Sequence, residues 1–211
     1  MATQDPRLIR LVAARYHQMQ GLTTMADAFV PLYVAAAYYV MLDDWWQAGL
    51  FLAGMILYMW SRHTWMRRRI NAYYSGRFGR TGWMETRENL GFWFFMAIGF
   101  NDSLRDMFQA PVYVRIAFML AALCAYPLWI AVRDFPFRLH WLAVFVAGFA
   151  AAIRIPFVPV GQGGDLWVRD SNLAIGLALL AAGALDHLLL TYALGVGAPE
   201  ASRLEEERPS A

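Results

Sequence analysis

The sequence contains no lysine, a single cysteine and few charged residues of any kind. All eighteen basic side chains are arginine, and charged residues make up only 16% of the 211 residues. Cys124 stands alone within an apolar run, which excludes an intrachain disulfide and is typical of a small buried side chain. No serine-nucleophile motif and no HExxH metal motif is present. We therefore expect a non-enzymatic protein with no metal site.

Hydrophobic residues are in excess and are grouped in runs. They make up 59% of the chain, whereas ordinary globular domains are about 45–50% apolar. Runs of this length are typical of helices that cross a bilayer, so the sequence predicts an all-α integral membrane helical bundle. Six transmembrane helices are expected, over residues 26–42, 45–60, 92–104, 112–132, 141–160 and 172–194.

The third apolar run is the shortest. Only nine residues, Phe92–Phe100, precede Asn101 and Asp102, whereas a transmembrane helix needs about 20 residues. The run either reaches the far headgroups with a polar end or does not cross. Five transmembrane helices therefore stay open beside six.

The segment 61–90 holds seven of the eighteen arginines and only two acids, Glu85 and Glu88. Short basic loops between spans stay on the cytoplasmic side. Six spans place fourteen arginines inside and three outside, and five spans place thirteen inside and four outside. Both counts predict a multipass protein of the cell inner (plasma) membrane, with the N-terminus and loop 61–90 cytoplasmic.

Three regions follow from this pattern. Residues 1–25 form an N-terminal cytoplasmic segment, residues 26–194 form the bundle with its loop, and residues 195–211 form a flexible tail. Leu8, Val12, Tyr16 and Met19 recur at helical spacing, so we expect an N-terminal amphipathic helix on the inner membrane face. A frayed, solvated tail is the alternative for this segment.

The arginines of the loop either control topology alone or also bind anionic lipid or a partner. The candidate binding residues are Arg62, Arg67, Arg68, Arg69, Arg77 and Arg80. Our leading interpretation is an accessory or structural subunit of a larger membrane complex. Its expected partners are membrane lipids and other integral membrane subunits, and no nucleic acid is expected because no nucleic-acid-binding fold surrounds the arginines.

Ionisable residues inside spans are the other candidates, since they are costly in a bilayer. Arg154 is expected to pair with an outer acid (Asp102, Asp106, Asp165 or Asp170), or alternatively to bind an anion or headgroup. Asp186 and His187 are adjacent in the last span, and His140 lies toward the same side. A structural hydrogen-bonded pair is expected here. The alternative function is a small transporter, or a protein that binds quinone, pigment or haem.

Two stretches, AYYSGRFGR (Ala72–Arg80) and AAGALDHLLL (Ala181–Leu190), resemble segments of uncharacterised small bacterial multipass membrane proteins. The resemblance covers only these two segments. It implies a multipass helical fold and no particular activity.

Overall fold

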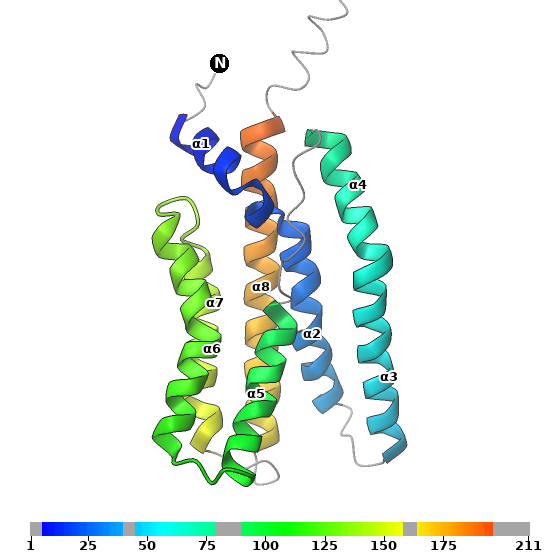
Figure 1. Ribbon diagram of the computed structural model, residues 1–211, viewed down its shortest axis with the longest axis vertical. Coiled ribbons are helices and arrows are strands. Elements are labelled where there is room, and N and C mark those ends of the chain that lie inside the picture. The colour runs from blue at the N-terminus through cyan, green and yellow to red at the C-terminus, as the bar shows by residue number, and fades with distance from the viewer. Residues whose placement is uncertain (1–5, 40–44, 79–89, 158–163, 196–211) are drawn as a thin grey trace, which may run out of the picture.

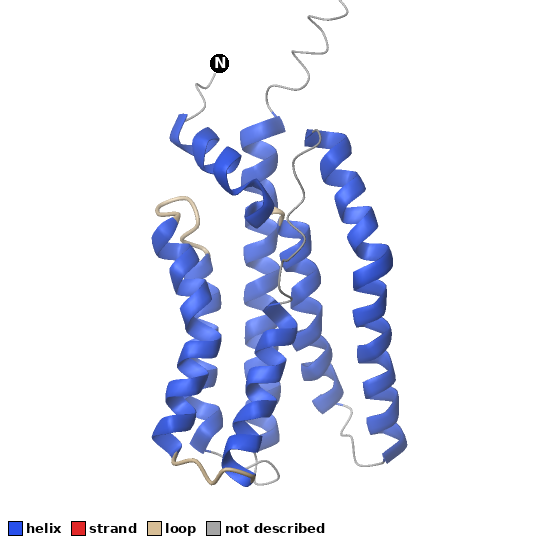
Figure 2. Ribbon diagram, viewed as in Figure 1, coloured by secondary structure: helices blue, strands red, loops and turns tan. Residues whose placement is uncertain are grey.

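The computed structural model describes residues 6–39, 45–78, 90–157 and 164–195, and these residues form an all-helical bundle (Figures 1 and 2). The all-α prediction is thus confirmed. The helices are α1 (Pro6–Arg15), α2 (Gly21–Tyr39), α3 (Trp45–Ser61), α4 (Arg67–Phe78), α5 (Leu90–Asp106), α6 (Val112–Arg133), α7 (Trp141–Arg154) and α8 (Gly164–Gly195). A π-helical turn, Arg62–Met66, joins α3 to α4 as one long rod.

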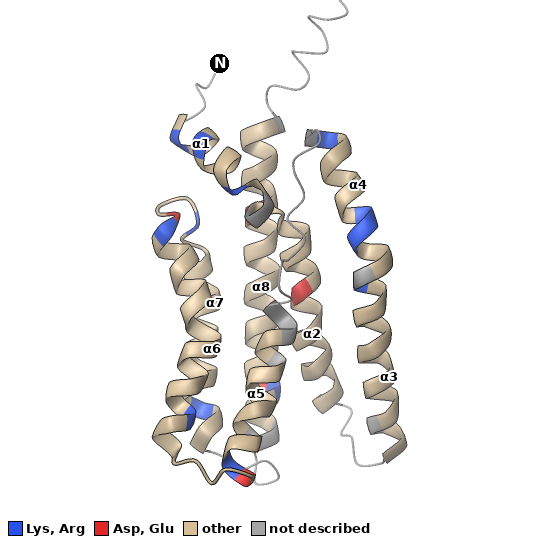
Figure 3. Cartoon of the chain, viewed as in Figure 1, with Lys and Arg blue, Asp and Glu red and all other residues tan. Residues whose placement is uncertain are grey.

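The long helix α8 runs through the centre of the bundle, with α2 beside it (Figure 1). The α6–α7 hairpin packs on α8, and α5 contacts α2 and α6. Successive long helices run in opposite directions. Consequently α1, α4, the turn at residues 133–140 and the last turns of α8 lie at one end, where Figure 3 shows many of the arginines. We call this the basic end, and we call residues 105–115, 150–157 and 164–172 the opposite end.

Glycines allow α2 and α8 to pack closely. A Cβ atom on Gly21 would lie 1.8 Å from the carbonyl oxygen of Gly183, and one on Gly176 would lie 2.6 Å from Leu32 Cγ. Gly176 and Gly183 are seven residues apart and so share one face of α8. Small residues at this spacing let two helix backbones approach each other in a bundle.

The main core lies between α5, α6, α7 and α8, and Trp141, Met119 and Leu179 are among its fully buried side chains. A second cluster lies at the basic end, where the predicted stripe of Leu8, Val12, Tyr16 and Met19 packs with residues of α4 and α8. The amphipathic helix of the N-terminal segment is therefore present as α1. Its apolar stripe is buried against the bundle rather than against a lipid surface, because it packs with Tyr74 of α4 and Leu190 of α8.

By length and composition, two helical stretches within the described ranges could cross a bilayer, Val112–Arg133 and Leu166–Leu194, and a shorter apolar helix covers Trp141–Phe157. The prediction of six transmembrane helices is not supported by this test. The physical reason is that α5 has 17 residues and α7 has 14, fewer than the about 20 that a span needs, and the strongly apolar part of the α3–α4 rod is limited to the 17 residues of α3. In α2, Thr23, Thr24 and Asp27 dilute the apolar run.

The helix boundaries also refine two expectations. The short third run is one unbroken helix, α5, that extends through Asn101 to Asp106. The rod that begins with α3 continues beyond the predicted span 45–60 and ends at Phe78. The rest of the basic loop, residues 79–89, and the C-terminal tail after Gly195 lie outside the described residues.

Candidate functional site at the basic end

The carboxylate of Asp186, in α8, is fully buried and accepts hydrogen bonds from side chains of the α6–α7 hairpin. Arg138 donates through Nε to Oδ1 at 2.9 Å and through Nη2 to Oδ2, so its guanidinium binds the carboxylate in a bidentate manner. Trp141 Nε1 donates to Oδ2 at 3.1 Å, and His140 Nε2 lies 2.9 Å from Oδ1. Four nitrogen atoms therefore surround a group with about four acceptor positions.

A second acid extends this cluster toward α1. Arg138 donates through Nη1 to Asp134 Oδ2 at 3.1 Å, and Arg133 donates through Nε to Oδ1 of the same carboxylate at 2.7 Å. Arg15 of α1 approaches Asp134 at 3.9 Å. Acids and bases thus alternate from Arg15 through Asp134 and Arg138 to Asp186. We call the following residues the buried ion network: Arg15, Arg133, Asp134, Arg138, His140, Trp141 and Asp186.

The local sequence explains how the turn between α6 and α7 presents these groups. Asp134 follows the last residue of α6, and its N–H still bonds to the carbonyl of Ile130. Its own carbonyl then accepts from the N–H groups of Phe137 and Arg138 at 3.0 and 3.4 Å. This compact turn places the Asp134 and Arg138 side chains one helical turn apart, where an ion pair can form.

The pKa of Asp134 reflects two opposing causes. Burial raises the pKa, but the hydrogen bonds and positive charges of Arg133 and Arg138 together outweigh burial and hold the pKa below its ordinary value. Asp134 is therefore a carboxylate at neutral pH. Its negative charge balances the arginines that the turn brings into the protein interior.

His187 lies beside the network but contacts a different helix. Its Nδ1 atom lies 3.0 Å from the hydroxyl of Tyr74, a residue of α4 that is almost fully buried. The same hydroxyl accepts from the backbone N–H of Leu22 at 3.2 Å, and the carbonyl of Tyr74 accepts from Tyr16 at 3.3 Å. The Tyr74 hydroxyl oxygen accepts from the Leu22 N–H, and its hydrogen can be donated in a hydrogen bond to Nδ1 of His187. Tyr74 therefore joins α4 to both α2 and α8.

Consecutive helical residues point about 100° apart, and Asp186 and His187 accordingly face α7 and α4 respectively. Among the predicted intramembrane residues, the structure brings Asp186 and His140 into contact. It places His187 against Tyr74 instead.

The predicted binding arginines fall into different environments. Arg62 forms an ion pair with Asp27, a fully buried acid of α2, and so ties the α3 rod to α2. Arg68, Arg69 and Arg77 are exposed on α4, and the guanidinium of Arg69 lies 5.6 Å from the ring centroid of Trp65. Arg67 is half-buried. Arg80 lies outside the described residues.

Arg154, the last residue of α7, lies at the opposite end. Its guanidinium stacks over the ring of Trp167 at 4.8 Å. The expected pairing with Asp106 or Asp170 is wrong, because these acids pair with Arg105 and Arg169, their neighbours in sequence. For the other two acids that were considered, Asp102 and Asp165, the side chains lie outside the described part of the structure.

Sequence reasoning missed Asp134, Arg138, Trp141, Tyr74 and Asp27. A signal existed for Asp27, since it is an acid near the start of an apolar helix. It also existed for the turn, where Arg133, Asp134 and Arg138 follow one another between two apolar helices. No sequence signal pairs Arg138 with Asp186, because 48 residues separate them.

Within the described residues, no group of three histidine, cysteine, aspartate or glutamate side chains is placed to hold a metal ion. Comparison with known proteins adds no relative: no family model, no curated protein and no solved structure matches this chain.

Proposed function

We propose that this chain is a non-enzymatic multipass protein of the inner (plasma) membrane, an accessory subunit whose basic end lies in the cytoplasm. The observation that carries the proposal is the separation of charge and apolar surface. Exposed arginines of α1 and α4 share one end with the turn at residues 133–140 (Figure 3), whereas large apolar side chains are exposed along the flanks of the helices. A water-soluble bundle would bury such flanks.

The rod formed by α3 and α4 supports a bilayer as the surrounding medium. Leu50, Leu52, Ile56 and Leu57 are each more than half exposed on α3. Exposed Trp45 begins the rod, and exposed Trp65 follows 20 residues later, a rise of about 30 Å along a helix. That length matches the hydrocarbon thickness of a bilayer, and tryptophan favours both of its interfaces. Lipid acyl chains would therefore cover this face of α3.

The basic end would then contact the cytoplasmic leaflet. Arg68 and Arg69 are exposed beside Trp65, and Arg10 is exposed on α1. Basic residues near an anionic membrane surface contribute about 1 kcal/mol each. In contrast, Arg62 forms an ion pair with Asp27, so we assign Arg62 to holding the bundle together rather than to lipid binding.

The test is a topology measurement based on the single cysteine. Replacing the buried Cys124 by alanine gives a cysteine-free chain. A single new cysteine is then introduced by Ser75→Cys on α4 or by Met107→Cys after α5. A membrane-impermeant maleimide should label position 75 only in inverted vesicles and position 107 only in right-side-out vesicles. Labelling of both positions from one face, or recovery of the chain in the soluble fraction, would contradict the proposal. A second subunit covering α3 would instead appear as a stoichiometric partner after purification in mild detergent.

A small transporter, or a quinone-, pigment- or haem-binding protein, is the alternative. One observation favours it, namely the buried contact of Asp186 with His140, next to His187. Against it, Arg138 and Trp141 also occupy the Asp186 carboxylate. A visible absorption spectrum of the purified protein tests the haem- and pigment-binding forms of this alternative, since a bound haem or pigment absorbs visible light and the accessory subunit does not.

A further inference from the structure

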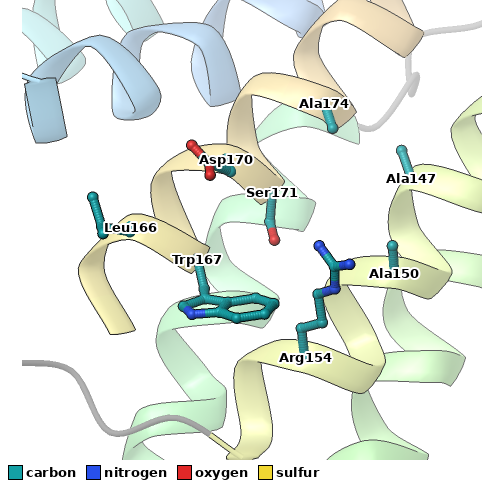
Figure 4. A pocket seen from close by; sticks show the side chains of 8 residues that line it. All are labelled: Ala147, Ala150, Arg154, Leu166, Trp167, Asp170, Ser171 and Ala174. Carbon is teal, nitrogen blue, oxygen red and sulfur yellow. The ribbon is translucent and has the colours of Figure 1, made fainter. Parts of the chain in front are cut away.

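A pocket of about 300 Å³ lies between α7 and α8 at the opposite end of the bundle (Figure 4). Its lining residues are Ala147, Ala150, Arg154, Leu166, Trp167, Asp170, Ser171 and Ala174. Alanines form one wall, and Figure 4 shows the guanidinium of Arg154 and the hydroxyl of Ser171 converging beside the indole of Trp167. The pocket therefore combines a small apolar wall with two kinds of hydrogen-bond donor.

Arg154 is the cation of this pocket, and no acid among the described residues neutralises it. Its one described contact is the stacking over Trp167 at 4.8 Å, which uses the face of the guanidinium and leaves its five N–H donors available. Asp170 also lines the pocket, but its carboxylate pairs with Arg169 at 2.8 Å and is turned away from Arg154 (Figure 4). The N–H donors of Arg154 therefore face the pocket, and the Asp170 carboxylate does not accept from them.

Two further observations point to an anion. Ser171 is only 9% exposed, so its hydroxyl is held in place at the pocket wall. Arg115 lies near the start of α6, which packs antiparallel to α7, so it belongs to the same end as Arg154. It is only 8% exposed, and its Nε and Nη1 atoms have no hydrogen-bond partner. Arg154, and Arg115 apart from its longer-range attraction to Asp106, thus lack the adjacent aspartate partner that Arg105 and Arg169 each have.

We propose that this pocket binds an oxyanion, the phosphate or carboxylate of a small amphipathic ligand. Arg154 binds the oxyanion through its planar fork, Ser171 donates to it, and the alanine wall contacts the adjoining apolar part. Guanidinium forks match the geometry of phosphate and carboxylate oxygens, and stacking on an indole holds the fork in place. An anionic lipid headgroup and a soluble phosphate share this chemistry, and the experiment separates the two sources.

The experiment follows thermal unfolding of the full chain in an uncharged detergent, with all variants made in an Arg68→Gln, Arg69→Gln background that weakens lipid binding at the basic end. The probes are phosphatidylglycerol, phosphatidylcholine and inorganic phosphate. The matched control for Arg154→Gln is Arg105→Gln, since Arg105 is an arginine of the same end that pairs with Asp106 and does not line the pocket. Circular dichroism checks that each variant keeps its helix content.

We expect phosphatidylglycerol to raise the unfolding midpoint and phosphatidylcholine to have little effect. Arg154→Gln should raise the half-saturating concentration about tenfold, Ser171→Ala about threefold and Arg105→Gln less than twofold. A response of this kind to inorganic phosphate alone would support the same site with a soluble ligand. Equal responses in the Arg154→Gln and Arg105→Gln variants, or no response to either anion, would overturn the proposal.

Discussion

The arginines at the two ends of the bundle form ion pairs with different kinds of partner. Arg138, at the basic end, and Arg62, in the π-helical turn that leads to it, pair with acids 48 and 35 residues away, on other helices. At the opposite end, Arg105 and Arg169 pair with the aspartate that follows each of them. A pair of adjacent residues exists whether or not the helices are assembled, whereas a pair between helices forms only when they pack. The difference indicates that the basic end holds the helices in register.

The largest effect should come from the centre of the buried ion network. Asp186→Ala leaves the buried Arg138 with Asp134 but without its bidentate partner, and should cost about 3–5 kcal/mol, because a buried charge loses a carboxylate that neutralises it. Thermal unfolding in detergent measures this cost. The matched control, Asp170→Ala at the opposite end, should cost no more than about 1 kcal/mol, since its ion pair is solvent-exposed. Similar losses in the two variants would remove the distinction between the ends.

The second comparison concerns the helix backbones. Gly21→Ala places a Cβ atom 1.8 Å from the Gly183 carbonyl oxygen, so α2 and α8 must separate, at a cost of about 1–3 kcal/mol or more. Gly99→Ala in α5 meets nothing within 4 Å and should instead stabilise its helix by about 0.5–1 kcal/mol. Unfolding midpoints test both. A neutral Gly21→Ala variant would show that α2 and α8 do not need this close approach.

The third comparison is the response to acid. The pKa of Asp134 is lower in the folded protein than in the unfolded chain, so its contribution to stability is complete above about pH 4 and is lost as the pH falls through the folded value. Unfolding of the wild type and of Asp134→Asn should be measured from pH 6 to pH 3. The wild type should lose more stability than the variant over this range. Parallel curves would show that Asp134 is not held as a carboxylate by Arg133 and Arg138.

The smallest effect should come from a single hydroxyl. Tyr74→Phe removes the partner of His187 and of the Leu22 N–H, and should cost about 1–2 kcal/mol. Tyr113→Phe at the opposite end changes an exposed residue and should be within about 0.5 kcal/mol of the wild type. A Tyr74→Phe variant as stable as Tyr113→Phe would mean that the hydroxyl does not tie α4 to α2 and α8.

Much of the fold is readable from the sequence. The apolar runs predict helices because each must satisfy its backbone within the segment, and α6 follows its run closely, whereas α8 begins eight residues before the predicted span. The stripe of Leu8, Val12, Tyr16 and Met19 predicts the amphipathic α1, although not what it packs against. The buried ion network was not predictable in this way. Its members are ordinary turn and helix residues until α8 is placed beside the α6–α7 hairpin.

The same limit applies to each candidate residue. Arg62 and Arg68 look alike in the sequence, yet one neutralises Asp27 inside the bundle and the other is exposed. Arg154 was expected to find an acid nearby, but Asp106 and Asp170 pair with the arginines beside them. Charge and position predict which end a residue occupies, and only packing decides its partner.

The sequence by itself determined that this protein is made of helices, and it determined which segments carry the arginines. These properties depend on hydrogen bonds within each helix and on the order of residues along it. The tertiary structure alone decided that Asp186 is enclosed by Arg138, His140 and Trp141, and that Arg154 faces a pocket with Trp167 and Ser171. Such contacts join residues far apart in the chain, and their geometry is fixed only when α7 packs against α8.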